Sequence, residues 1–129
     1  MSFKKGNLFL GSLLIFCFLS LPNFSQAAIS LVQKAKNNGA ASISISWGSP
    51  TTVGNLLIAI VSGTGTGTPS VSAPSGWVQA NTVVASPQIR LSVFYKENAA
   101  SETSTGNFTT SGNGISAIVA EYSGVVASG

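Results

Sequence analysis

The sequence predicts an all-β fold, an antiparallel β-sandwich, and three observations support that prediction. No segment of residues 28–129 combines a helical spacing of apolar residues with capping residues at its ends. Short runs of β-branched and other apolar residues recur, and several alternate with polar residues at a period of two. Clusters of Gly, Pro, Ser and Asn separate these runs at close intervals, which is typical of a sandwich.

The first 27 residues are expected to be a secretory signal peptide. Lys4 and Lys5 form a basic start, residues 8–21 form an apolar run, and a small-x-small motif ends at Ala27. The apolar run is shorter than the ~20 residues that a spanning helix needs. We therefore expect cleavage between Ala27 and Ala28, no stable membrane span, and a protein that is secreted or held at the cell surface.

The remaining residues, 28–129, are predicted to form one β-sandwich domain with little charge. Loss of Lys4 and Lys5 with the leader lowers the formal net charge from +3 to +1, which provides no basic patch for nucleic acid. Cys17 lies in the leader, so the domain has no thiol or disulfide chemistry. The chain has no His and no Asp. Histidine-dependent triads, most zinc sites and acid-rich calcium loops are thereby excluded, and we expect no metal and no cofactor.

The first half of the domain contains the most apolar run. Residues 55–62 are continuously apolar over a strand's length and follow a glycine, so we expect a strand that is buried on both faces. Residues 42–47 instead alternate, with Ile43, Ile45 and Trp47 sharing one face. The expected order is a first strand or extended lead-in over 28–35, a turn at 37–39, a strand at 42–47, a strand at 55–62, a flexible loop at 63–69 and a short extended piece at 71–73.

The chain is organised around a turn at 73–77, Ala-Pro-Ser-Gly-Trp. Pro74 fixes its own φ, and Gly76 adopts a positive φ without steric cost, so the turn delivers Trp77 to the start of a new strand. Strands are then expected at 78–85, 89–96, 107–111 and 115–122. The run 89–96 alternates most clearly, with Ile89, Leu91, Val93 and Tyr95 on one face and Arg90, Ser92, Phe94 and Lys96 on the other.

Three aromatic residues, Trp47, Trp77 and Tyr95, are the candidate ligand-binding residues. Exposed aromatic rings stack on sugars, while neighbouring hydroxyl and amide groups supply hydrogen bonds. The alternative is that the rings belong to the core, and we favour this alternative for Trp77 because a small sandwich needs its large side chains inside. For Trp47, which lies next to a turn, both interpretations remain open.

The three glutamates of the chain offer little for catalysis. Glu97 and Glu102 could act as an acid and base pair on a glycosidic bond, but solvated loop charges are the simpler interpretation. Glu121 shares a face with apolar residues, so a buried carboxylate there would need a partner such as Arg90 or Lys96. We assign no catalytic residue and predict that the protein is not an enzyme.

Several motifs, taken together, resemble a module of bacterial secreted and surface proteins. They are P-S-G-W at 74–77, the segment RLSVFYKENAASETSTGNFT at 90–109, A-I-V-A-E-Y-S-G-V at 117–125, and V-G-N-L-L-I-A at 53–59. Asn55 stands where that module usually has Asp. The resemblance implies a jelly-roll-like β-sandwich without assigned catalytic activity, in which Glu102 has a structural role in its loop. It also implies a second run of strands after Y-S-G-V, so we expect a truncated copy.

The expected function is that of a non-enzymatic module that binds a polysaccharide or a surface protein. The alternative is a structural spacer or assembly unit of a fibre or multidomain protein, and a glycan hydrolase ranks third. Unpaired strand edges with few charges to protect them would favour self-association, or pairing with a missing C-terminal half.

Overall fold

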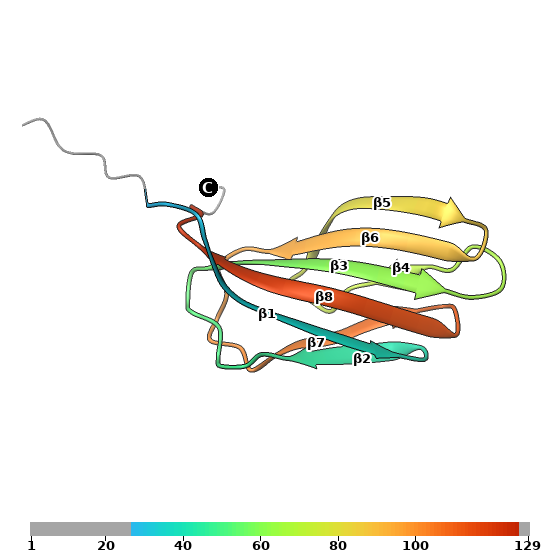
Figure 1. Ribbon diagram of the computed structural model, residues 1–129, viewed down its shortest axis with the longest axis horizontal. Helices are drawn as coiled ribbons and strands as arrows, with labels where there is room; N and C mark the ends of the chain where they lie inside the picture. Colours follow the sequence, from blue (N-terminus) through green and yellow to red (C-terminus); the bar gives the residue numbers. More distant parts are fainter. Residues whose placement is uncertain (1–26, 127–129) are drawn as a thin grey trace, which may run out of the picture.

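The computed structural model describes residues 27–126, which form two antiparallel β-sheets packed against each other (Figure 1). Residues 1–26 of the predicted leader, which was expected to end at Ala27, lie outside the described residues. The prediction of an all-β antiparallel sandwich is confirmed, because the described residues contain strands and no helix. The strands are β1 (Ser30–Gly39), β2 (Ser42–Ser46), β3 (Leu56–Thr64), β4 (Val71–Ser72), β5 (Val78–Ser86), β6 (Ile89–Lys96), β7 (Ser104–Thr110) and β8 (Gly114–Ser123).

The large sheet has five strands in the order β1-β8-β3-β6-β5, and the small sheet has three in the order β2-β7-β4. Strand β1 pairs with β8, β2 with β7, and β3 with β6, so the chain is folded like a long hairpin that has been rolled up. This nested pairing is that of a jelly roll. The pattern is broken only at β4 and β5, because β5 pairs with β6 in the large sheet.

The core lies between the two sheets, and aromatic residues occupy its centre. Phe108 of the small sheet is fully buried. Its ring meets Trp77 edge-on at a centroid distance of 5.3 Å and Phe94 of the large sheet at 5.8 Å. Aliphatic residues of β2, β3 and β8 surround these rings, namely Ile43, Ile45, Leu57, Ala59, Val61, Ile115, Ala117 and Val119. Gly63 of β3 lies close to the small sheet, since a Cβ added there would lie only 2.7 Å from the Thr110 hydroxyl oxygen.

The turn before β5 has the predicted form. Gly76 has a φ of 86°, and the Trp77 amide donates a hydrogen bond to the Pro74 carbonyl at 3.3 Å. A glycine with positive φ at the third position of such a four-residue turn is typical of type II geometry. Strand β5 begins at the next residue, so the tryptophan is placed at the entrance of the strand as expected.

Two predictions about strands were wrong. Strand β3 is buried on one face only, because the small sheet covers its inner side while Ile60 on its outer side is 47% exposed. Strand β1 does not stop before a turn at 37–39 but continues to Gly39, which pairs with Ile115 of β8. The Asn37 side chain donates to the Ser44 carbonyl at 2.8 Å and so fastens the end of β1 to β2.

Candidate functional site

The three candidate aromatic residues are not brought together. Trp47 and Trp77 are 7% and 9% exposed and belong to the core, and the Trp77 indole N–H donates to the Thr105 carbonyl at 3.3 Å. The core position favoured for Trp77 is confirmed, and the question left open for Trp47 is answered in the same way. Tyr95 lies on the opposite side of the large sheet, because strand β6 turns Phe94 toward the core and its neighbour away from it. These residues form no common aromatic platform for a sugar.

Glu121 is fully buried at the end of the sandwich where β1 and β3 begin. Its hydrogen-bond donors are uncharged groups. Its carboxylate accepts hydrogen bonds from the Gln33 side chain at 2.6 Å, the Thr52 amide at 2.7 Å and the Asn55 side chain at 2.7 Å. Burial by itself would raise the pKa of this carboxyl, but the hydrogen bonds outweigh it and the pKa lies below its usual value. The expectation of Arg90 or Lys96 as partner was wrong. Glu121 thus links three segments of the fold and is closed off from solvent.

The cations that were expected near Glu121 have other partners. Lys96 forms an ion pair with Glu102 at 2.5 Å, and the Arg90 guanidinium donates to the Pro69 carbonyl at 2.6 Å. The Glu102 amide also donates to the Thr51 hydroxyl at 2.8 Å, so this residue joins two loops. Among residues 27–126 no group of three or more potential metal ligands occurs, and no helix is long and apolar enough to cross a membrane.

The outer face of the large sheet is unusually apolar. Strand β6 has its more apolar side turned outward, because Ser92 and Phe94 face the core while Leu91 and Val93 face away from it. The same outer face carries Ile60 of β3 and Ile118 of β8, which are 47% and 56% exposed. We call this surface the outer face, and its apolar residues include Leu56, Ile58, Ile60, Val78, Val83, Ile89, Leu91, Val93, Tyr95, Ile118, Ala120 and Tyr122.

The strand registers align the side chains of the outer face in rows that cross all five strands. The central row is Lys36, Ile118, Ile60, Val93 and Asn81, listed from β1 to β5. The next row toward the Glu121 end is Lys34, Ala120, Ile58, Tyr95 and Val78, and the next row in the other direction is Asn38, Ser116, Ser62, Leu91 and Val83. Apolar residues therefore cover β8, β3 and β6 without interruption in the central row and in the row toward the Glu121 end, while the third row has serines on β8 and β3.

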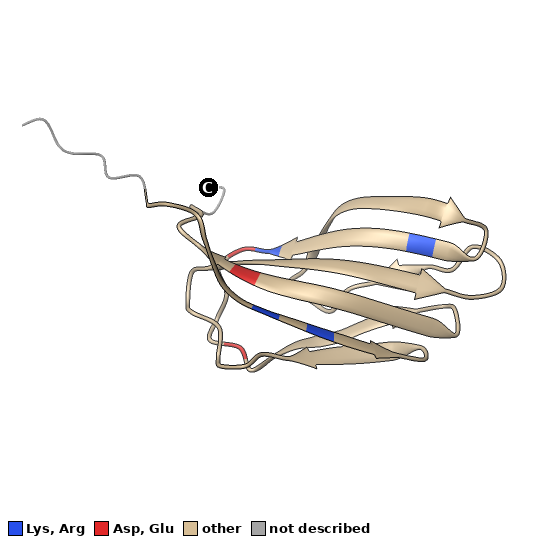
Figure 2. Cartoon of the chain, in the orientation of Figure 1, with Lys and Arg blue, Asp and Glu red and all other residues tan. Residues whose placement is uncertain are grey.

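Charge on the outer face is confined to one border. Within the five strands that form this face, the outward-facing charged residues are Lys34 and Lys36, and both lie on the edge strand β1. Figure 2 shows strands β3 and β5 without any charged residue. A monomeric sheet exposed to water normally alternates apolar residues inside with polar residues outside, so this surface is the strongest binding candidate among the described residues.

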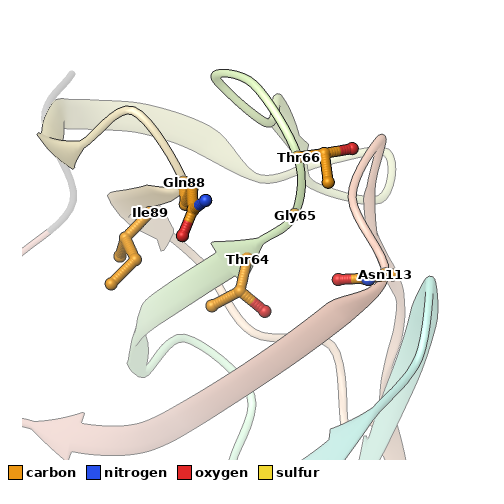
Figure 3. A pocket seen from close by; sticks show the side chains of 6 residues that line it. All are labelled: Thr64, Gly65, Thr66, Gln88, Ile89 and Asn113. Carbon is orange, nitrogen blue, oxygen red and sulfur yellow. The ribbon is translucent and has the colours of Figure 1, made fainter.

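A shallow depression of about 350 Å³ at the opposite end of the sandwich is a weaker candidate (Figure 3). It lies where the end of β3, the β5–β6 turn and the β7–β8 turn meet, and is lined by Thr64, Gly65, Thr66, Gln88, Ile89 and Asn113. Backbone bonds from Gly65 to Gln88 and from Asn113 to Thr64 close this end. The lining contains no aromatic ring and no charge, so it offers neither a stacking surface nor a catalytic group.

Comparison with known proteins adds no assignment: no family model, no curated protein and no solved structure matches this chain. The candidate site therefore rests on geometry alone. Sequence reasoning missed the outer face, although two signals pointed to it. One signal was the apolar side of the run 89–96. The other was the run 55–62, which is apolar on both faces, although among the described residues only the small sheet is available to cover one of them.

Proposed function

We propose that this chain is a secreted, non-enzymatic β-sandwich module that binds a protein surface through the outer face. The observation that carries the proposal is the orientation of β6, whose apolar side points away from the core. Binary patterning would place such a side against another layer. Each Å² of apolar surface removed from water contributes about 25 cal/mol, so a partner covering this face gains substantial stabilisation.

A protein partner is favoured over a polysaccharide because of the kind of side chain on the face. Sugar recognition uses flat aromatic rings together with polar groups. Both tryptophans are buried, and the centre of the outer face is formed by aliphatic residues such as Ile60, Ile118 and Val93. Aliphatic sheet faces pack well on other apolar surfaces, at about 10 Å between layers. The alternative function, a structural unit of a fibre or multidomain protein, is supported by the same apolar outer face.

Export is the first part of the proposal to test. We expect the chain, expressed with its own leader in a bacterial host, to be recovered outside the cytoplasm with Ala28 as its first residue. Intact-mass measurement and N-terminal sequencing of the recovered protein check this. Recovery of uncleaved chain in the cytoplasm would contradict secretion. The protein that binds the outer face would then have to be an intracellular one.

The binding surface is tested with a matched pair of substitutions at the centre of each sheet. Ile60→Lys places a charge on the outer face of β3, and Thr109→Lys places the same charge on the exposed side of β7 in the small sheet. Purified protein is co-sedimented with envelopes of the producing cells, with protease-treated envelopes, and with cellulose and chitin. We expect retention only on untreated envelopes, at least about tenfold weaker for Ile60→Lys and unchanged for Thr109→Lys. Retention on the polysaccharides, or equal losses for both variants, would overturn the proposed surface.

A further inference from the structure

We propose that the partner of the outer face is a second copy of this chain, packed face to face about a twofold axis that runs parallel to β3. This inference rests on the proposed function and names the occupant of the same surface. In such a dimer the central strand β3 of one copy lies over β3 of the other, and the two large sheets form the inner layers of a four-layer assembly.

The size of the outer face is sufficient for a weak specific dimer. Five strands at ~4.8 Å spacing and about eight residues at ~3.3 Å rise cover roughly 600 Å². Two such faces bury about 1,200 Å², which is the lower limit for specific protein interfaces. We therefore expect association at micromolar or higher concentration, and not a permanently associated dimer.

The distribution of charge selects the direction of the axis. An axis parallel to the strands places β1 of one copy over β5 of the other, so that Lys36 faces the uncharged Asn81. An axis perpendicular to the strands would place β1 over β1 and bring the lysines of the two copies together. Like charges that meet across an interface are strongly unfavourable, so the parallel axis is favoured.

The sizes of the side chains agree with the same axis. About this axis, each row of one copy lies over the same row of the other copy, with the order of its strands reversed. The small Ala120 of one copy therefore lies opposite the large Tyr95 of the other. In the next row Ser116 lies opposite Leu91. Large residues facing small ones allow two layers to interdigitate, while Ile60 at the centre of the face meets Ile60 of the partner copy.

A charge-swap experiment tests self-association. The oligomeric state of purified protein is measured by sedimentation equilibrium from low micromolar to millimolar concentration, for the unmodified chain, Ile60→Lys, Ile60→Glu and an equimolar mixture of the two variants. We expect dimers of the unmodified chain, at least about 100-fold weaker association of each variant alone, and restored association in the mixture. Thr109→Lys is the control and should dimerise normally. If Ile60→Lys does not fold, Ile118→Lys on the adjacent strand replaces it.

Cross-linking tests the axis. The predicted exported chain has no cysteine, so Lys36→Cys and Asn81→Cys introduce single thiols. A short bis-maleimide should join a Lys36→Cys copy to an Asn81→Cys copy, and should not join two Lys36→Cys copies. The reverse result would overturn the proposed axis. A chain that stays monomeric at every concentration would overturn the dimer, while envelope binding that still depends on Ile60 would leave the proposed function standing.

Discussion

Replacing Glu121 with alanine is expected to lower the free energy of unfolding by about 3 kcal/mol, because the change leaves three partly buried hydrogen-bond donors without their acceptor. The carboxylate is fully buried and accepts from Gln33, Thr52 and Asn55, at distances between 2.6 and 2.7 Å. These donors belong to β1 and to the segment between β2 and β3, while the acceptor lies on β8. One side chain therefore holds three parts of the chain together.

The identity of the group matters as well as its size. Glu121→Gln keeps the shape but turns an amide N–H₂ toward one of the donors. Gln33 cannot easily rotate to accept it, because its own amide group donates to the Ser49 carbonyl and accepts from the Ser49 N–H. We expect a loss of about 2 kcal/mol, measured by urea unfolding. Glu102→Ala removes a carboxylate whose ion pair with Lys96 is partly exposed, so it serves as the control and should cost about 1 kcal/mol.

The pH dependence of stability provides an independent check on Glu121. Its folded pKa lies below the usual value of 4.5, so in acid the unfolded chain binds this proton more readily than the folded chain does. The stabilisation is therefore fully present above about pH 4.5 and is lost as the pH falls through the folded pKa. The unmodified protein should lose stability in this range, and Glu121→Gln should lose less. Identical acid profiles for the two proteins would contradict the assigned hydrogen bonds.

The partners of Glu121 show why this centre could not be predicted from the sequence. A buried carboxylate suggests a cation, and the sequence offered Arg90 and Lys96, but the structure places both on β6, a strand that does not pair with β8. Gln33 lies 88 positions before Glu121, and only the pairing of β1 with β8 brings the two together. Neutral amide donors carry no signal in the sequence that distinguishes them from surface residues.

Strand β6 marks a different limit of prediction. Its bounds and the division of its side chains between two faces follow from the period of two, and both were predicted correctly. The alternation does not say which face turns inward. Ser92 is accommodated in the interior because its hydroxyl lies 2.9 Å from the hydroxyl of Thr82 on β5. Phe94 on the same side reaches Phe108 of the other sheet, and this contact between distant segments places the apolar side outside.

Phe108→Ala is expected to be as damaging as the loss of Glu121, because Phe108 makes the central aromatic contact between the two sheets. Its fully buried ring extends from β7 to Phe94 of the large sheet and to Trp77 at the entrance of β5. Deleting a phenylalanine ring from a packed core costs about 3–5 kcal/mol, partly through the cavity that remains. We expect a loss in this range in urea unfolding, and a shift of tryptophan emission to longer wavelength as water reaches Trp77.

Two neighbouring substitutions separate the effect of packing from a general effect of mutation. Phe108→Leu keeps an apolar side chain of smaller volume and should cost clearly less than alanine, about 1–2 kcal/mol. Thr109→Ala changes the next residue, which is exposed on the other side of β7, and should stay within about 0.5 kcal/mol. If Phe108→Ala were no more destabilising than Thr109→Ala, the two sheets would not depend on this aromatic contact. The cohesion of the sandwich would then have to come from the aliphatic residues around it.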